Sequence, residues 1–142
     1  MNTYIGRKTI MAKPMTLGEY NTYRGWGIPE DEDPSTEGYL VEYTDGGKAN
    51  HPDHEGYISW SPADVFARSY MPADTHTDRM KIEYSELEAN LGKLQGFMNG
   101  KAYADLNQEQ KLLMQQQEQL MVLFMDTLRK RIAADEAAAK EA

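Results

Sequence analysis

The stretch that decides the fold runs from Asp78 to Ala134. It contains RMKIEYSELEANLGKLQGFM (79–98), NGKAYADL (99–106) and NQEQKLLMQQQEQLMVLFMDTLRKRIAA (107–134). In the first segment, apolar residues recur at alternating spacings of four and three, which is typical of one helix face packed against a partner helix. They are Met80, Tyr84, Leu87, Leu91, Leu94 and Met98.

The third segment predicts a second helix that packs on the first. Its apolar series is Leu106, Leu113, Leu120, Phe124 and Leu128. Gly100 lies in the short break between the two segments, at a place where a helix C-terminus favours glycine. Residues 75–134 are therefore expected to form a long antiparallel helical hairpin, followed by an Ala-rich tail at 135–142.

The second helix has more apolar residues than one seam needs. Those outside the series are Leu112, Met114, Met121, Val122, Leu123 and Met125. A helix that is apolar on more than one face needs more than one neighbour. This excess favours a homo-oligomer.

Residues 1–74 predict a small α+β unit that is rich in antiparallel strands. The expected strands are 4–13, 39–43 and 56–61, and the expected short helices are 16–23 and 61–70. Thr16 and Glu19 have the spacing of a capping box. In the next helix Ser61 is the expected N-cap, followed by Pro62 at the first position, and Val65 and Phe66 are expected to be buried. The fold class is thus α+β, with the hairpin following the small unit.

Composition excludes several classes of function. The net charge is −8, and residues 1–77 carry 6 Lys/Arg against 12 Asp/Glu. Such an acidic chain is unsuited to binding a nucleic-acid polymer, because that binding depends on basic residues at the phosphates. The absence of cysteine excludes disulfides and thiolate chemistry. No segment has the length of a membrane span, so we expect no membrane partner and a cytosolic location.

No motif predicts catalysis. The sequence has no nucleophile elbow, Walker loop, dinucleotide fingerprint or zinc-protease motif, so we expect no enzyme, no catalytic residue and no cofactor. His51 and His54 lie beside acids, but their spacing matches no strong metal motif, and a mobile loop explains them better. No metal site is therefore predicted.

Aromatic and basic residues supply the candidates for ligand binding. The aromatic residues are either core or a wall on which a base stacks; they are Trp26, Tyr39, Tyr43, Tyr57, Trp60, Phe66, Tyr70 and Phe97. Lys93, beside the seam, either extends along apolar surface or meets a phosphate. In an antiparallel hairpin Arg79 converges with the cluster Arg129–Arg131, although part of that cluster is ordinary helix C-terminal charge. Arg68, on the expected helix 61–70, completes the candidate set.

Several segments together resemble a known group of phage proteins. The segment RMKIEYSELEANLGKLQGFM, followed by a helix that ends in LRKRI, resembles the hairpin shared by the first Thoeris anti-defence family and the second anti-CBASS family. PMTLGEYNTYRGW (14–26), GYLVEYTDGG (38–47) and GYISWSPADVF (56–66) resemble the β-rich domain that precedes the hairpin in the Thoeris family.

This resemblance implies a sponge that binds cyclic nucleotide immune signals without cleaving them, inside an infected bacterial cell. The implied ligands are glycocyclic ADP-ribose and cyclic di- and trinucleotides. The implied assembly is a dimer, or a hexamer built as a trimer of dimers. By resemblance, Lys93 faces phosphates, Phe97 stacks on adenine and Asn107 forms hydrogen bonds. The position of Arg131 on its helix assigns it to a trinucleotide pocket. The alternatives are an oligomeric protein-interaction module and, with less support, a hydrolase of such signals.

Overall fold

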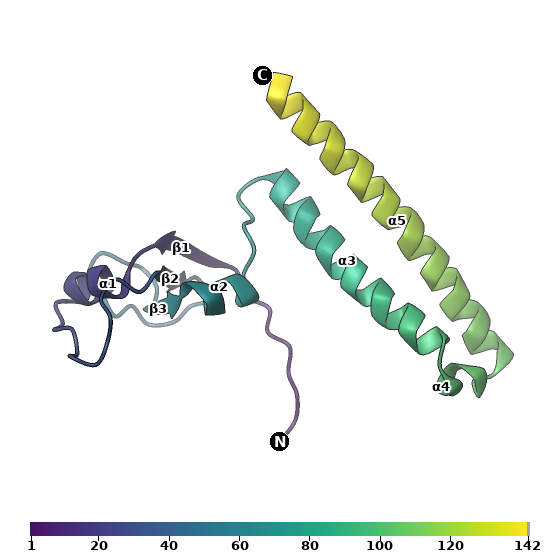
Figure 1. Cartoon of the computed structure of the whole chain (residues 1–142), viewed down its shortest axis with the longest axis horizontal. Coiled ribbons are helices and arrows are strands. Elements are labelled where there is room, and N and C mark those ends of the chain that lie inside the picture. Colours follow the sequence, from purple (N-terminus) through teal and green to yellow (C-terminus); the bar gives the residue numbers. More distant parts are fainter. Residues whose placement is uncertain (142) are drawn as a thin grey trace. The chain divides into compact units, whose positions relative to one another are not determined.

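The computed structural model describes residues 1–141 and divides the chain into two compact units, Met1–Tyr70 and Met71–Ala142. The first unit contains a three-stranded antiparallel sheet with short helices, and the second contains two long helices packed as a hairpin (Figure 1). The α+β fold class expected from the sequence is therefore confirmed.

The sheet is built around its central strand, β2. Strands β1 (Ile10–Pro14), β2 (Gly38–Tyr43) and β3 (Ile58–Pro62) lie in the order β1-β2-β3. The first strand is shorter than expected, because β2 pairs Tyr43 with Ile10 and then turns away at Gly46, whose φ is 93°. Residues 1–9 thus have no strand to continue the ladder.

Both faces of β2 are covered. Leu40 and Val41 are 3% and 1% exposed, although neighbouring residues of a strand point to opposite faces. Leu40 packs with Tyr20 of α1 (Leu17–Arg24) and with Ile58. On the other face, the ring of Tyr39 stacks on Phe66 of α2 with 3.9 Å between centroids. The small unit therefore has a core of its own.

The two short helices begin in different ways. Thr16 caps α1 and forms the expected capping box with Glu19. Helix α2 (Ala63–Ser69) begins one residue later than expected, with Pro62 at the N-cap position and no side-chain cap. The expectation that Val65 is buried was wrong, because this side chain is 41% exposed and Phe66 alone turns toward the sheet.

The hairpin consists of α3 (His76–Met98), the single turn α4 (Lys101–Ala104) and α5 (Gln108–Glu141). Thr75 and Asp78 form a capping box at the start of α3. Gly100 has a φ of −99° and caps α4, so it does not end α3 in the left-handed conformation. Residues 135–141, expected as a tail, continue α5 without a break.

The apolar seam of α3 is confirmed. The series assigned to α5 is confirmed at Leu106 and Leu128, which are half-buried and buried, and was wrong at its other three members. All six expected α3 residues are buried or half-buried. On α5, Leu113, Leu120 and Phe124 are 56%, 59% and 43% exposed. The α5 residues with reduced exposure instead follow a neighbouring series, consisting of Met114, Met121, Met125, Leu128 and Ile132. Because α5 is apolar over a broad arc, spacing alone did not show which part faces α3.

Candidate functional site

The turn end of the hairpin carries a small cluster of aromatic and polar side chains. The ring of Tyr103, on α4, lies edge-on to Phe97 with 6.5 Å between centroids. Gln115 donates a hydrogen bond to the Tyr103 hydroxyl at 3.0 Å, and the Lys111 ammonium lies 5.9 Å from the ring centre. Tyr103 and Lys111 were not among the predicted residues. Tyr103 lies in the break between the two long helices, and this position could have indicated it as a candidate residue.

Lys93 and Phe97 lie on one exposed face of α3. They are four residues apart, a spacing that places side chains on the same side of a helix. Phe97 is 40% exposed, and Lys93 is exposed and forms no salt bridge within residues 1–141. An uncompensated ammonium and an open ring on one face suit a ligand that has both a phosphate and a base.

Asn107 has a local structural role at the start of α5. Its side-chain oxygen accepts a hydrogen bond from the backbone N–H of Gln110 at 2.9 Å, as an N-cap residue does. The side-chain NH₂ group remains exposed to solvent and can donate elsewhere. Phe97 thus precedes α4 in the sequence and Asn107 follows it. Phe97 offers a ring for stacking, and Asn107 offers a free NH₂ group for hydrogen bonding.

The other end of the hairpin is less basic than expected. The Asp126 carboxylate accepts hydrogen bonds from the Arg129 guanidinium and the Lys130 ammonium, each at an N···O distance of 2.7 Å. These contacts hold the pKa of the Asp126 carboxyl below its ordinary range. Arg79 donates to the backbone carbonyls of Ala73 and Asp74. Arg131 is exposed and forms no salt bridge within residues 1–141. Of the predicted basic cluster, Arg79 and Arg131 thus keep their charges available, because Arg79 contacts only neutral carbonyls.

Two side-chain contacts between α3 and α5 hold the same end together. His76 lies 2.6 Å from Asp135, and Lys81 lies 2.7 Å from Glu136. The hydrogen bond from Lys81 lowers the pKa of Glu136, and the same contact raises the pKa of Lys81. Because these acids follow the predicted basic cluster by one turn, they reduce the positive potential at this end.

Trp60 and Arg68 belong to the small unit. The Trp60 indole N–H donates to the Met15 carbonyl at 2.8 Å, which ties β3 to the segment before α1. Arg68 is exposed on α2 and lies 3.6 Å from Asp64, one turn away. Of the aromatic residues weighed as core or stacking wall, Tyr39 and Phe66 pack on each other, whereas Trp26 and Tyr57 are 53% and 47% exposed.

The two loop histidines are held in place. His54 contacts the Glu42 carboxylate at 2.6 Å through Nδ1 and the Tyr23 hydroxyl at 2.8 Å through Nε2, while the His51 ring stacks on Tyr23. The hydrogen bonds from His54 and from the Gly56 N–H lower the pKa of Glu42. These contacts join the loop to β2 and α1, which the interpretation as a mobile loop did not foresee. Within residues 1–141, no group of three or more His, Asp or Glu side chains is arranged to hold a metal ion.

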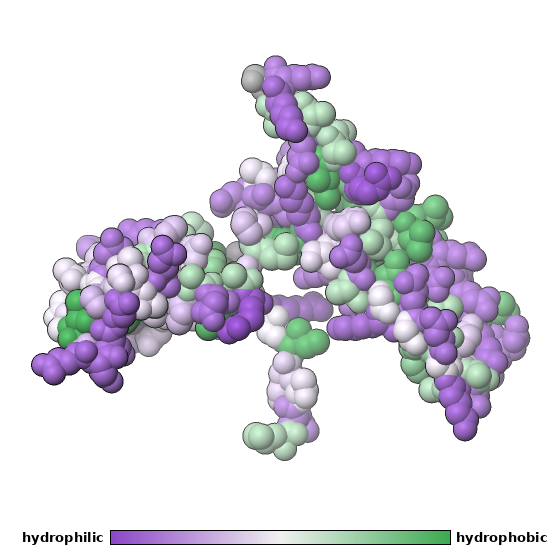
Figure 2. Space-filling view, viewed as in Figure 1, coloured by the Kyte–Doolittle hydropathy of each residue, from purple (hydrophilic) through white to green (hydrophobic). Residues whose placement is uncertain are grey.

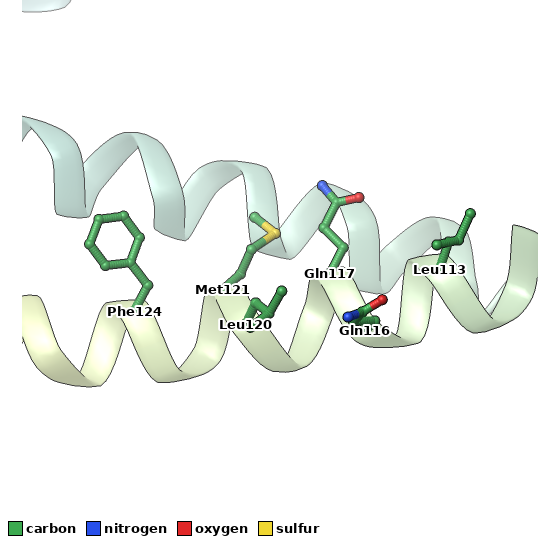
Figure 3. A pocket seen from close by; sticks show the side chains of 6 residues that line it. All are labelled: Leu113, Gln116, Gln117, Leu120, Met121 and Phe124. Carbon is green, nitrogen blue, oxygen red and sulfur yellow. The ribbon is translucent and has the colours of Figure 1, made fainter.

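An exposed apolar face runs along α5. A shallow hollow of about 380 Å³ lies on it, and Figure 3 shows the side chains that line it, all from α5: Leu113, Gln116, Gln117, Leu120, Met121 and Phe124. Figure 2 shows hydrophobic atoms at the hairpin surface between hydrophilic ones. Leu112, Val122 and Leu123 are also between 46% and 64% exposed. This face is large for a surface that only meets water.

Comparison with protein families bears on this hairpin. Residues 74–134 match the family model named Sequestin. The hairpin is a Sequestin domain. The matched segment contains the Lys93–Phe97 face, Asn107, Arg131 and most of the exposed α5 face, and it leaves residues 1–73 outside the match. No curated protein and no solved structure matches the chain. No helix in residues 1–141 is long and apolar enough to cross a membrane.

Proposed function

We propose that this protein is a sponge that captures cyclic nucleotide immune signals and holds them without cleaving them. The signals are glycocyclic ADP-ribose, cyclic di- and trinucleotides, or both classes. In this proposal a phage produces the protein in the cytoplasm of the infected bacterial cell, where capture of the signal keeps the defence system inactive. The observation that carries the proposal is the Sequestin match over the hairpin, whose name describes sequestration.

The exposed groups of the hairpin fit this task. Phe97 offers a ring for base stacking, Lys93 and Arg131 offer positive charges for phosphates, and Asn107 offers a hydrogen-bond donor. Such contacts bind a nucleotide without attacking it, since none of them is a nucleophile or a positioned general base. To deplete a signal, the dissociation constant must lie well below the signal concentration. A nanomolar constant, about −12 kcal/mol, meets that requirement.

A homo-oligomer completes the proposal. The apolar face of α5 has no partner within residues 1–141, and a second copy is the simplest surface to cover it. A dimer, or a hexamer built as a trimer of dimers, places the candidate residues of one copy near those of another. The pockets would then lie between subunits.

Isothermal titration of the whole protein tests this function. The ligands are glycocyclic ADP-ribose, a cyclic dinucleotide and a cyclic trinucleotide, and linear AMP-type dinucleotides serve as controls. We expect nanomolar binding of at least one cyclic ligand. An absence of binding to all three cyclic ligands contradicts the proposal.

The exposed α5 face also suits a second function, that of a protein-interaction module. This alternative predicts a stoichiometric host or phage protein partner and no nucleotide binding. Titration and pull-down with the same preparation therefore separate the two functions. A signal hydrolase, in contrast, would convert the ligand with turnover.

A further inference from the structure

The small unit contains an open basin lined by aromatic and polar side chains. Its volume is about 460 Å³, within the range of roughly 300–1,000 Å³ that is usual for small-molecule sites. Its walls come from α1, from the loop that follows α1 and from β3. The lining residues used below are Tyr20, Asn21, Arg24, Trp26, Tyr57 and Trp60.

Asn21 is the residue that indicates a ligand. Its side chain is only 6% exposed, and its amide forms no hydrogen bond within residues 1–141. Every fully buried side-chain nitrogen or oxygen in that range has a partner, so the Asn21 amide must still reach solvent. Asn21 lines the basin, which is an open space that its amide can face. A buried amide normally has a protein partner, and this one is left to pair with something else.

Arg24 and Trp26 add a charge and a flat surface beside this amide. The Arg24 guanidinium lies 4.4 Å from the centre of the Trp26 ring system and donates to the Tyr20 hydroxyl at 3.2 Å. Arg24 forms no salt bridge within residues 1–141. The guanidinium is therefore held in place by neutral groups, which leaves its charge available to an anion.

We infer that this basin is a binding site for a nucleotide with an adenine-type base and a phosphate. The Asn21 amide offers an acceptor and a donor side by side, which is the pattern that pairs with N6 and N7 of adenine. The exposed indole of Trp26, or the ring of Tyr57, stacks on the base, and Arg24 binds the phosphate. The inference goes beyond the proposed sponge function, because the basin lies within Met1–Tyr70 and uses no hairpin residue.

Tryptophan fluorescence of the whole protein tests the site directly, since Trp26 and Trp60 both line the basin. The ligands are AMP, adenosine, UMP and inorganic phosphate. We expect saturable changes with AMP and weaker ones with adenosine. The variant Arg24→Gln should weaken AMP binding about tenfold or more without changing adenosine binding, because it removes only the charge.

The variant Asn21→Leu keeps the number and branching of the side-chain heavy atoms and removes both hydrogen-bonding groups, so it should weaken AMP and adenosine binding alike. Arg7→Gln, which removes an exposed arginine of the same unit that does not line the basin, is the matched control and should leave both unchanged. If Asn21→Leu fails to fold, Arg24→Gln still decides. Equal affinity for AMP and UMP, unchanged AMP binding in Arg24→Gln, or no saturable change with any ligand would overturn the inference.

The hairpin variant Phe97→Ala separates this site from the sponge function. We expect it to bind AMP at the basin as the wild type does, while its affinity for a cyclic nucleotide falls. Loss of AMP binding in Phe97→Ala would contradict a separate basin site. Failure of cyclic nucleotide binding in the wild type would count against the sponge and leave the AMP result unaffected.

Discussion

The two units of this chain maintain their folds by different means. In Met1–Tyr70, polar side chains connect distant segments: Glu42 and Tyr23 hold His54, and the Trp60 indole holds the Met15 carbonyl. In the hairpin, one apolar seam joins α3 to α5, and the His76–Asp135 and Lys81–Glu136 contacts hold the open end together. The small unit uses these polar groups internally, whereas within residues 1–141 the apolar face of α5 stays exposed.

This difference indicates where each unit meets other molecules. The exposed aromatic residues Trp26 and Tyr57 of the small unit gather at one basin. The exposed apolar residues of the hairpin extend along a helix, which is the shape of a surface that packs on another helix. We therefore expect stability to depend on protein concentration for the hairpin and on pH for the small unit.

The largest effect is expected from the seam itself. Leu128 is fully buried, so Leu128→Ala should lower the free energy of unfolding by about 2–5 kcal/mol through lost contacts and a cavity. Leu112→Ala, at a residue that is 53% exposed, is the matched control and should cost much less at low protein concentration. Chemical unfolding followed by circular dichroism measures both. Equal losses would show that α5 packs on α3 through another face.

The next effect concerns the ligand. Phe97→Ala should weaken binding of a cyclic nucleotide by about 1–3 kcal/mol, the usual contribution of one aromatic ring stacked on a base. Val65→Ala, at an exposed apolar residue of the small unit, should leave the affinity unchanged. Isothermal titration gives both constants. An unchanged affinity in Phe97→Ala would remove this ring from the binding site.

The apolar face of α5 should determine the mass of the protein in solution. Leu120→Glu introduces a charge on this face and should shift the assembly toward monomer. Gln119→Glu adds the same charge at an exposed neighbouring position outside the hollow and should not. Light scattering over a range of concentrations measures the mass. A wild type that is monomeric at every concentration would refute the assembly and its inter-subunit pockets.

The smallest effect is the response to acid. The folded-state pKa of Glu42 is lowered by its hydrogen bonds, so its contribution to stability is present above the ordinary glutamate pKa and is lost as pH falls through the folded value. Glu42→Gln removes this titration and should flatten the loss of stability below about pH 4.5. Glu136→Gln should flatten it less, because its side chain is 48% exposed against 22% for Glu42. Thermal unfolding as a function of pH provides the comparison.

The sequence predicted the elements better than their contacts. Capping signals at Thr16 and the spacing from Met80 to Met98 have local causes, so they could be read directly from the chain. The seam of α5 could not, because Leu120 and Met121 are equally apolar and only the partner helix decides which one packs against it. The basin was missed for a related reason: Asn21, Arg24 and Trp26 are polar or aromatic residues of a short helix and its loop, and their convergence depends on β3.

The predicted ligand-binding residues form no single cluster within one unit. Lys93 and Phe97 share a face of α3 because their spacing of four fixes it. Arg129 and Lys130 form salt bridges with Asp126, which lies three and four residues earlier in the sequence. Their charges are therefore less available to a ligand. This pairing was visible in the sequence as helical spacing, and weighing it would have reduced the expected basic cluster to Arg79 and Arg131.

The most direct test of the central claim is recovery of the bound ligand. Wild-type protein is incubated with a cyclic nucleotide at a concentration below that of the protein. Unbound ligand is removed by dialysis, and the protein is then denatured. The released nucleotide is identified by mass spectrometry. The account predicts that the ligand is retained in proportion to the protein and is recovered intact. Failure to retain the ligand, or recovery of a linear product, would contradict it.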